Sequence, residues 1–260
     1  MRIDMHTHIK SDMLGRICRE TVEKYRENGI DKIVLIEPID VCLAAAEKFP
    51  DFIIPIALIN MNIATEYEII EYIEKGAYGI KFIAPEAPYG DEQFWPLYRV
   101  LEQLNKPAIF HTGYLTLNFP YFKWNAQNIE FMRASQIDII ARRFPNLKIL
   151  MAHFSNPWWE EAWKISFSNL NVYSDLSGGT AFIRSLDMWT EILAPNGEFL
   201  KASFDRLCFG SDMHYFIEGN MPFISHLEFY ERLFDRINLP ESYREKVNWK
   251  NAAEFLGILS

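Results

Sequence analysis

Short apolar, β-rich runs alternate with longer amphipathic segments along the whole chain. The runs that predict strands are residues 2–6, 32–36, 52–58, 78–83, 107–111, 147–153, 171–176 and 206–210. Strands that alternate with helices usually pair in parallel, with the helices covering the sheet. Eight such units fill 260 residues, a common length for one α/β barrel. We therefore expect a single domain over residues 1–260, a (β/α)8 TIM barrel, with a doubly wound open sheet as the alternative.

The segments between these runs have recognisable helix ends. Thr65 is placed to cap the start of one helix, and Gly76 is placed to end it. Asn28-Gly29 ends an earlier helix, and residues 243–256 predict a last helix. Pro55 interrupts the third predicted strand and weakens that prediction, because proline cannot donate a backbone hydrogen bond.

The most informative motif is Asp4-Met5-His6-Thr7-His8, at the carboxyl end of the first predicted strand. Alternate residues of a strand point to the same side, so Asp4, His6 and His8 are expected to share a face. Two imidazoles on one face suit a single metal ion. Six histidines in a chain of this length will sometimes fall two apart by chance, but barrel enzymes build their sites at this end of the strands.

Three further polar residues follow predicted strands in the same way. His111 ends the fifth strand in IFHTG, His153 ends the sixth in LMAHFS, and Asp212 follows the eighth in CFGSD. Taken singly, each residue could be a satisfied core or capping group. In a closed barrel, however, all these strand ends meet at one mouth. The pattern therefore predicts one metal site rather than scattered polar residues.

Composition narrows the setting of this site. The formal net charge of −9 argues against binding nucleic acid phosphates through bulk attraction. Three cysteines, Cys18, Cys42 and Cys208, show no CxxC spacing, which argues against a disulfide framework or a Cys-rich zinc site. The first residues form no apolar signal region, and no apolar run reaches transmembrane length. We expect a cytoplasmic protein that binds neither nucleic acid nor membrane.

The segments DMHTHI, GIKF, IFHTG, MAHFS, FGSDM and NAAEFLGI together resemble the amidohydrolase superfamily. The resemblance is to the amidohydrolase-2 branch, which includes aminocarboxymuconate semialdehyde decarboxylase. It implies that His6, His8, His111 and Asp212 are metal ligands, and that Asp212 also takes a proton. It implies a catalytic role for His153, which is a ligand in some members. It is also compatible with a homodimer.

The implied cofactor is one divalent metal ion. Three histidines and a carboxylate suit zinc best, with manganese and iron as alternatives. Lys81, in GIKF, lies on the strand where some superfamily members carry a carbamylated lysine that bridges two metals. We instead expect Lys81 to contact a substrate carboxylate or to form a structural ion pair. Asp175 is expected to contact a ligand histidine or to cap a helix, and Glu37 and Asn60 are weaker candidates for the same role.

The loops after the strands predict the substrate pocket. Tyr114 and Trp158 are expected to line an apolar pocket, and Arg184 to bind a substrate carboxylate, although helix packing or a dimer contact explains the aromatic residues equally well. The same prediction, an apolar pocket wall, covers the aromatic side chains of the loops at Phe119, Tyr121, Phe122, Trp124 and Trp159. Neither His214 nor His226 has a position that matches the family, and His214 is expected to have a structural or rim role.

Three functions fit these residues. The first is hydrolysis of a small amide, lactone or ester by metal-activated water. The second is non-oxidative decarboxylation of an aromatic or unsaturated carboxylic acid. The third, from another class, is a non-catalytic barrel that binds a small ligand, which the retained set of four histidines and one aspartate disfavours. We expect the hydrolase.

Overall fold

The structure, a computed structural model, describes residues 1–115, 128–179, 181, 184–217 and 221–258. Its strands are β1 (Ile3–His8), β2 (Lys32–Glu37), β3 (Ile53–Leu58), β4 (Gly79–Phe82), β5 (Ala108–His111), β6 (Ile149–Ala152), β7 (Val172–Asp175), β8 (Leu207–Cys208) and β9 (Met213–His214). All pair in parallel, in the order β8-β7-β6-β5-β4-β3-β2-β1-β9. All eight predicted strands are present, and the barrel prediction is confirmed.

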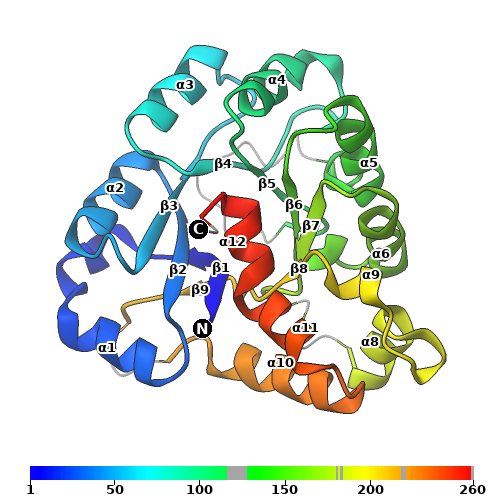
Figure 1. The fold of residues 1–260 in the computed structure, drawn as a ribbon. Coiled ribbons are helices and arrows are strands. Elements are labelled where there is room, and N and C mark those ends of the chain that lie inside the picture. Colours follow the sequence, from blue (N-terminus) through cyan, green and yellow to red (C-terminus); the bar gives the residue numbers. More distant parts are fainter. Residues whose placement is uncertain (116–127, 180, 182–183, 218–220, 259–260) are drawn as a thin grey trace.

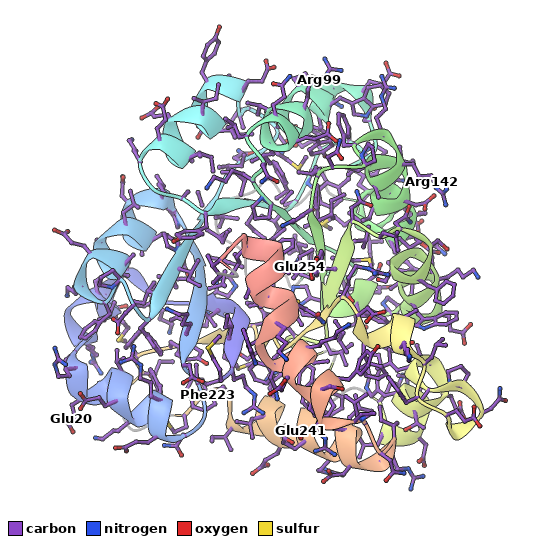
Figure 2. All side chains as sticks on the ribbon, viewed as in Figure 1. Glu20, Arg99, Arg142, Phe223, Glu241 and Glu254 are labelled. Carbon is purple, nitrogen blue, oxygen red and sulfur yellow. The ribbon has the colours of Figure 1, made fainter. Side chains whose placement is uncertain are left out.

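Most helices lie outside the strands in a ring, whereas the last one, α12 (Asn251–Leu256), lies across one end of the barrel (Figure 1). The other helices are α1 (Arg19–Glu27), α2 (Ile39–Lys48), α3 (Glu66–Glu74), α4 (Trp95–Gln103), α5 (Ala134–Arg143), α6 (Trp159–Ser168), α8 (Leu186–Leu193), α9 (Lys201–Phe204), α10 (Ile224–Arg236) and α11 (Glu241–Glu245). Charged side chains such as Glu20, Arg99 and Arg142 point outward from this ring (Figure 2). Within the described ranges, no helix combines the length and apolar character needed to cross a bilayer.

The segment between β8 and β9 closes the barrel against β1. Strands β8 and β9 stand at opposite ends of the hydrogen-bonded strand order. The amide of Met5 donates to the carbonyl of Phe209 at 3.0 Å, and the amide of Asp212 donates to the carbonyl of His6 at 2.6 Å. Sequence analysis missed β9, because Met213 and His214 form no apolar run. The pairing of β9 with β1 fixes Asp212 directly beside the histidine motif of β1.

Two apolar layers build the core. The larger one fills the space between the strands and the helices. The smaller one fills the amino-terminal half of the barrel with strand residues such as Ile3, Ile54 and Leu150, and Phe255 of α12 packs against them. Helix α12 thus covers the end of the barrel that faces the viewer in Figure 1. The opposite, carboxyl end of the strands is left to hold polar side chains.

Most predicted helix ends are found. Thr65 accepts a hydrogen bond from the amide of Glu68 at 3.3 Å, and Gly76 follows the helix with φ of +117°. The last helical segment begins at Glu241 rather than at residue 243, and a π-helical turn, Lys246–Lys250, joins α11 to α12. Pro55 does not break its strand, because β3 runs through it and pairs it with Leu35.

Candidate metal centre

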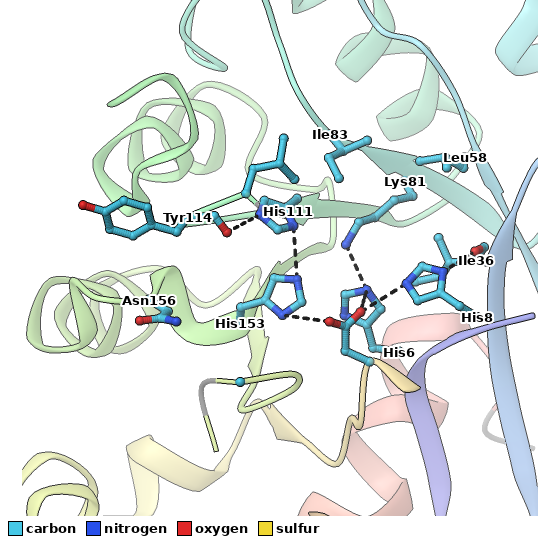
Figure 3. Close-up of a pocket in the computed structure, with 13 residues that line it drawn as sticks. His6, His8, Ile36, Leu58, Lys81, Ile83, His111, Tyr114, His153 and Asn156 are labelled. Carbon is cyan, nitrogen blue, oxygen red and sulfur yellow. Dashed lines mark hydrogen bonds and ion pairs between the residues drawn. The ribbon is translucent and has the colours of Figure 1, made fainter. Parts of the chain in front are cut away.

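The polar residues predicted at the strand ends meet in one pocket. His6 and His8 end β1, His111 ends β5, His153 follows β6, and Asp212 lies between β8 and β9. All five line a cavity of about 280 Å³. The four histidine rings point toward one another (Figure 3), and Asp212 lies within 3.4 Å of His6 and His8. The structure therefore brings together five residues that are spread over more than two hundred positions of the chain.

His8 shows why this pocket needs a cation. Its Nδ1 lies 2.9 Å from the carbonyl oxygen of Ile36, which can only accept, so Nδ1 carries the ring proton. Neutral His8 then directs the Nε2 lone pair at the Oδ1 atom of Asp212, only 3.1 Å away. Two electron-rich atoms at this distance require a proton or a metal ion between them. Burial alone would lower the pKa of His8, but hydrogen bonds to Asp212 and Glu37 outweigh it and raise the pKa to about 9.

His6 is buried and held in a similar orientation. Its Nδ1 faces Oδ2 of Asp175 at 3.4 Å and Oγ of Ser177 at 3.2 Å. Its Nε2 lies 3.4 Å from Oδ1 of Asp212 and 3.3 Å from Nζ of Lys81. Burial and the nearby Lys81 charge lower the pKa of His6 to about 3, so the ring is neutral and its Nε2 can donate electrons.

The spacing of these atoms fits a metal ion. Two zinc–ligand bonds of about 2.0–2.1 Å at the tetrahedral angle separate their donor atoms by roughly 3.3 Å. The distances from Oδ1 of Asp212 to the Nε2 atoms of His8 and His6 are 3.1 Å and 3.4 Å. Among the described residues, His6, His153 and Asp212 also offer one donor atom each within 4.8 Å of one another. The donor set and its spacing are those of a divalent cation site.

Asp212 is held in place by its backbone. It has φ of +61°, in the left-handed region that side chains other than glycine seldom adopt. Gly178 makes room for it, because a Cβ atom on Gly178 would lie 2.7 Å from Oδ2 of Asp212. Although burial opposes ionisation, interactions with the His6 and His153 imidazoles and the hydrogen bond with His8 hold the pKa of Asp212 well below its usual range.

His111 and His153 form a second pair of imidazoles. Nε2 of His111 lies 3.0 Å from the carbonyl oxygen of Tyr114, which gives Nε2 the proton and directs Nδ1 at Nε2 of His153, 3.1 Å away. Nδ1 of His153 lies 4.0 Å from Oδ2 of Asp212. In this arrangement His153, rather than His111, lies with His6 and Asp212, whereas the resemblance implies that His111 is the ligand.

The backbone turn after β6 sets the direction of the His153 ring. His153, Phe154 and Ser155 have φ of 63°, 46° and 50°. The amide of His153 donates to Oδ1 of Asp175 at 2.9 Å, and the amide of Ser155 donates to Oγ1 of Thr112 at 3.0 Å. These contacts stabilise a turn that is unusual for residues other than glycine, and the turn carries the ring into the pocket.

Comparison with known proteins agrees with the geometry. The sequence profile of the Amidohydrolase family matches residues 25–258, most of the chain. The chain belongs to the amidohydrolase family. The matched range begins after β1, so the assignment of His6 and His8 rests on the resemblance of their motif and on the geometry described above. No curated protein has a significant sequence match to this amidohydrolase.

Solved structures share the fold at low sequence identity. An uncharacterised TIM-barrel protein from Bordetella bronchiseptica is 19% identical, with 99% of this chain and 98% of that chain covered and a TM-score of 0.68. A probable 2-pyrone-4,6-dicarboxylic acid hydrolase from Acinetobacter baumannii is 16% identical (98% and 99% covered, TM-score 0.65). A 5-carboxyvanillate decarboxylase from Sphingomonas paucimobilis is 13% identical (99% of both, 0.67).

A second layer of polar residues supports the amidohydrolase pocket. Asp175 accepts hydrogen bonds from the hydroxyl of Ser177 at 2.5 Å and from its amide at 3.1 Å, while its other oxygen faces His6. The ionisation of Asp175 is favoured by His6, which outweighs burial and lowers its pKa. Asp175 thus contacts a histidine, as one of its two expected roles requires. Sequence analysis missed Ser177, although its position two residues after the end of β7 is the signal that could have found it.

Asp4 does not lie with the histidines. The pairing of β1 with β2 shifts between Asp4 and Thr7, and the expectation that Asp4 shares their face is wrong. Its carboxylate instead accepts from the hydroxyl groups of Ser211 at 2.6 Å and Tyr215 at 2.9 Å, and from the amide of Ser211 at 2.9 Å. Asp4 thereby ties β1 to the segment that carries Asp212.

Lys81 reaches the same pocket from β4. It is buried, and burial lowers the pKa of its ammonium group to about 8, against the opposing charges of Asp175 and Asp212. Nζ approaches Nε2 of His6 (Figure 3). Lys81 is therefore within reach of any substrate oxygen that approaches this cluster.

The remaining predicted residues divide between two regions. Tyr114 lines the pocket, as does Asn156, which sequence analysis missed although it closes the same turn as His153. Trp158 stacks on Tyr114 with ring centroids 6.1 Å apart, but it lines a separate groove beside α6. Arg184 lies over the ring of Trp159, 5.3 Å from its centroid, and Trp159 lines that groove too. The sequence predicts Trp158 and Arg184 at the metal pocket, but neither is among the described residues that line it.

Three other expected residues, Glu37, Asn60 and His214, have clear positions. Glu37 contacts His8 and accepts from the amide of Ile9, whereas Asn60 accepts from Asn62 within its own turn. The exposed His214 ring lies 5.6 Å from His8, at the rim as expected. The aromatic residues Phe119, Tyr121, Phe122 and Trp124 lie outside the described residues.

Proposed function

We propose that this amidohydrolase hydrolyses a small amide, lactone or ester at a divalent metal ion. The observation that carries the proposal is the approach of His8 and His6 to one oxygen of Asp212, in which two imidazole nitrogens face a carboxylate at metal-ligand spacing. We assign His6, His8, His111 and Asp212 as the ligands and His153 as a catalytic residue that lies close enough to ligate.

A divalent ion held by His6, His8, His111 and Asp212 would supply Lewis acidity, which would make a water molecule more acidic and polarise a substrate carbonyl. Asp212 has the geometry of a proton acceptor, because Oδ1 faces His6 and His8 while Oδ2 faces His153. Its low pKa keeps it ionised and ready to orient that water. His153, on the other side of Asp212, is placed to donate a proton to the leaving group.

The first test is the metal content of freshly purified protein, measured by elemental mass spectrometry together with the His6→Ala variant. We expect about one zinc ion per chain in the native protein and almost none in the variant. The His111→Ala and His153→Ala variants separate ligand from catalyst, because only loss of a ligand reduces the metal content. Folded native protein that neither contains nor takes up metal would contradict the proposal.

Non-oxidative decarboxylation is the second candidate, and Lys81 is the observation that favours it. Its Nζ lies beside the metal cluster, where it can hold a substrate carboxylate. A fold neighbour named as a 5-carboxyvanillate decarboxylase is compatible with this chemistry. A panel of lactones, cyclic amides and aromatic acids separates the candidates, since the hydrolase opens a ring or releases an amine or alcohol, and the decarboxylase releases carbon dioxide.

The proposal has four further parts. The ion is zinc, the substrate is a small molecule, the assembly is a homodimer and the location is the cytoplasm. Zinc is supported by the imidazole-rich donor set. A small substrate is supported by the cavity volume of about 280 Å³. Light scattering of the zinc-loaded protein tests the dimer directly.

A further inference from the structure

Different strands contribute side chains of different polarity to the pocket wall. Ile36 at the end of β2, Leu58 at the end of β3 and Ile83 just after β4 line it on one side. We call these three residues the apolar wall. The three strands are neighbours in the sheet, so the wall is continuous, and Leu58 pairs directly with Lys81 in the strand register. Figure 3 shows the wall residues grouped around Lys81, with Asn156 and Tyr114 on the far side.

Positive charge is confined to the floor of the pocket. Lys81 is the one lysine or arginine among the described lining residues, and its Nζ turns toward His6 rather than toward the wall. The far side offers the uncharged amide of Asn156, whereas the exposed phenol of Tyr114 points away from the pocket (Figure 3). At the separate groove beside α6, Arg133 pairs with Glu161 and Arg184 covers Trp159.

This distribution restricts what can bind. A carboxylate or a reacting carbonyl at the floor meets Lys81 and the metal site. A second carboxylate on the same small molecule would lie against the apolar wall, lose its water and gain no charged partner there. The volume of about 280 Å³ also leaves little room for retained water around it, since pockets for drug-sized ligands span roughly 300–1,000 Å³.

We propose that this site takes substrates with one anionic or reacting polar head and an apolar body of about one ring, and that the apolar wall excludes substrates with a second carboxylate. The inference rests on the proposed function, because the metal site anchors the head. Leu58 is the specificity-determining residue most open to change, since it is half-buried and adjoins Lys81.

Benzoate and isophthalate test the inference as matched probes that differ by one carboxylate. Titration calorimetry of the zinc-loaded protein is expected to show benzoate binding at least about tenfold more tightly than isophthalate. Leu58→Arg places a cation in the wall and should remove or reverse this preference. The matched control is Leu170→Arg on the exposed surface, which should retain it. Circular dichroism verifies that each variant is folded.

The native comparison needs no variant and decides the inference alone. Zinc-loaded native protein that binds isophthalate as tightly as benzoate overturns the inference and leaves the proposed function standing. A folded Leu58→Arg protein that keeps the native preference overturns the role of Leu58. Native protein that binds no zinc and neither probe overturns both proposals.

Discussion

The two sides of the pocket are built from the same structural unit but carry opposite chemistry. Strands β5, β6 and β1, with the β8–β9 segment, end in His111, His153, His6, His8 and Asp212, which we call the polar half. Strands β2 to β4 contribute the apolar wall of Ile36, Leu58 and Ile83. In the polar half, each described side chain is fixed by hydrogen bonds to a neighbouring segment. The apolar wall is fixed by packing alone.

The difference implies different responses to mutation. A change in the polar half removes a defined partner and leaves another buried polar group unsatisfied, so its effect concentrates on metal binding and proton transfer. A change in the apolar wall alters packing and the shape of the pocket, so its effect falls on stability and substrate choice. Four predictions, from the largest effect to the smallest, test this division.

The largest effect is expected for Asp212→Asn. The amide cannot take a proton and is a poorer ligand, so turnover of the substrate found in the panel should fall by about 10²–10⁴-fold. Asp187→Asn, on the exposed surface beside Arg236, is the control and should keep native turnover. Steady-state kinetics of both variants at equal metal loading measure the difference. A fully active Asp212→Asn protein would exclude this residue from catalysis.

The strand ends of both halves could be predicted from the sequence because each follows an apolar run. The convergence of His6, His8, His111, His153 and Asp212 follows from barrel closure, since the carboxyl ends of all strands meet at one mouth. No geometry beyond the strand order is needed for that step.

Other features depend on geometry that residue spacing does not encode. The register shift in β1 turns Asp4 away from the histidines, and β9 is only two residues long. The left-handed turn at residues 153–155 decides how close His153 comes to Asp212. Trp158 and Arg184 follow strands just as Tyr114 does, yet the course of each loop places them by the groove beside α6.

The next effect is a pH dependence of metal uptake. In the metal-free protein the pKa of His8 is raised to about 9, so His8 is protonated at pH 7, and metal must displace that proton. The pKa values of His6 and Asp212 are lowered, so these residues release none. Affinity should therefore rise by about tenfold per pH unit from pH 7 and level off near pH 9.

Calorimetry in two buffers with different ionisation enthalpies measures this exchange. Zinc binding at pH 7.5 should release about one proton per ion, and the release should vanish well above the pKa of His8. Proton release that does not change with pH would show that His8 does not hold the proton that the metal replaces.

A smaller effect is expected for Asp175→Asn, which alters the support of the polar half but none of its ligands. The variant loses the charge that faces Nδ1 of His6 at 3.4 Å, so zinc affinity should fall by about 10–100-fold. Competition with a chelating indicator measures the affinity. Asp138→Asn, whose native carboxylate pairs with Arg142 and accepts a hydrogen bond from Asn169 of the outer helices, should bind zinc as the native protein does. Equal affinities in the two variants would remove Asp175 from the metal site.

The smallest effect is expected in the apolar wall, for Ile36→Val. Removing one buried methylene should lower the free energy of unfolding by about 0.5–1.5 kcal/mol, because the neighbouring side chains relax only partly into the space. The zinc affinity should not change, since His8 contacts the backbone carbonyl of Ile36 and the side chain of Glu37 in this strand, and not the side chain of Ile36. Urea unfolding and chelator competition on the same preparation measure both quantities. A loss of zinc affinity comparable to that of Asp175→Asn would mean that packing in the wall also positions the ligands, and the division between the two halves would fail at β2.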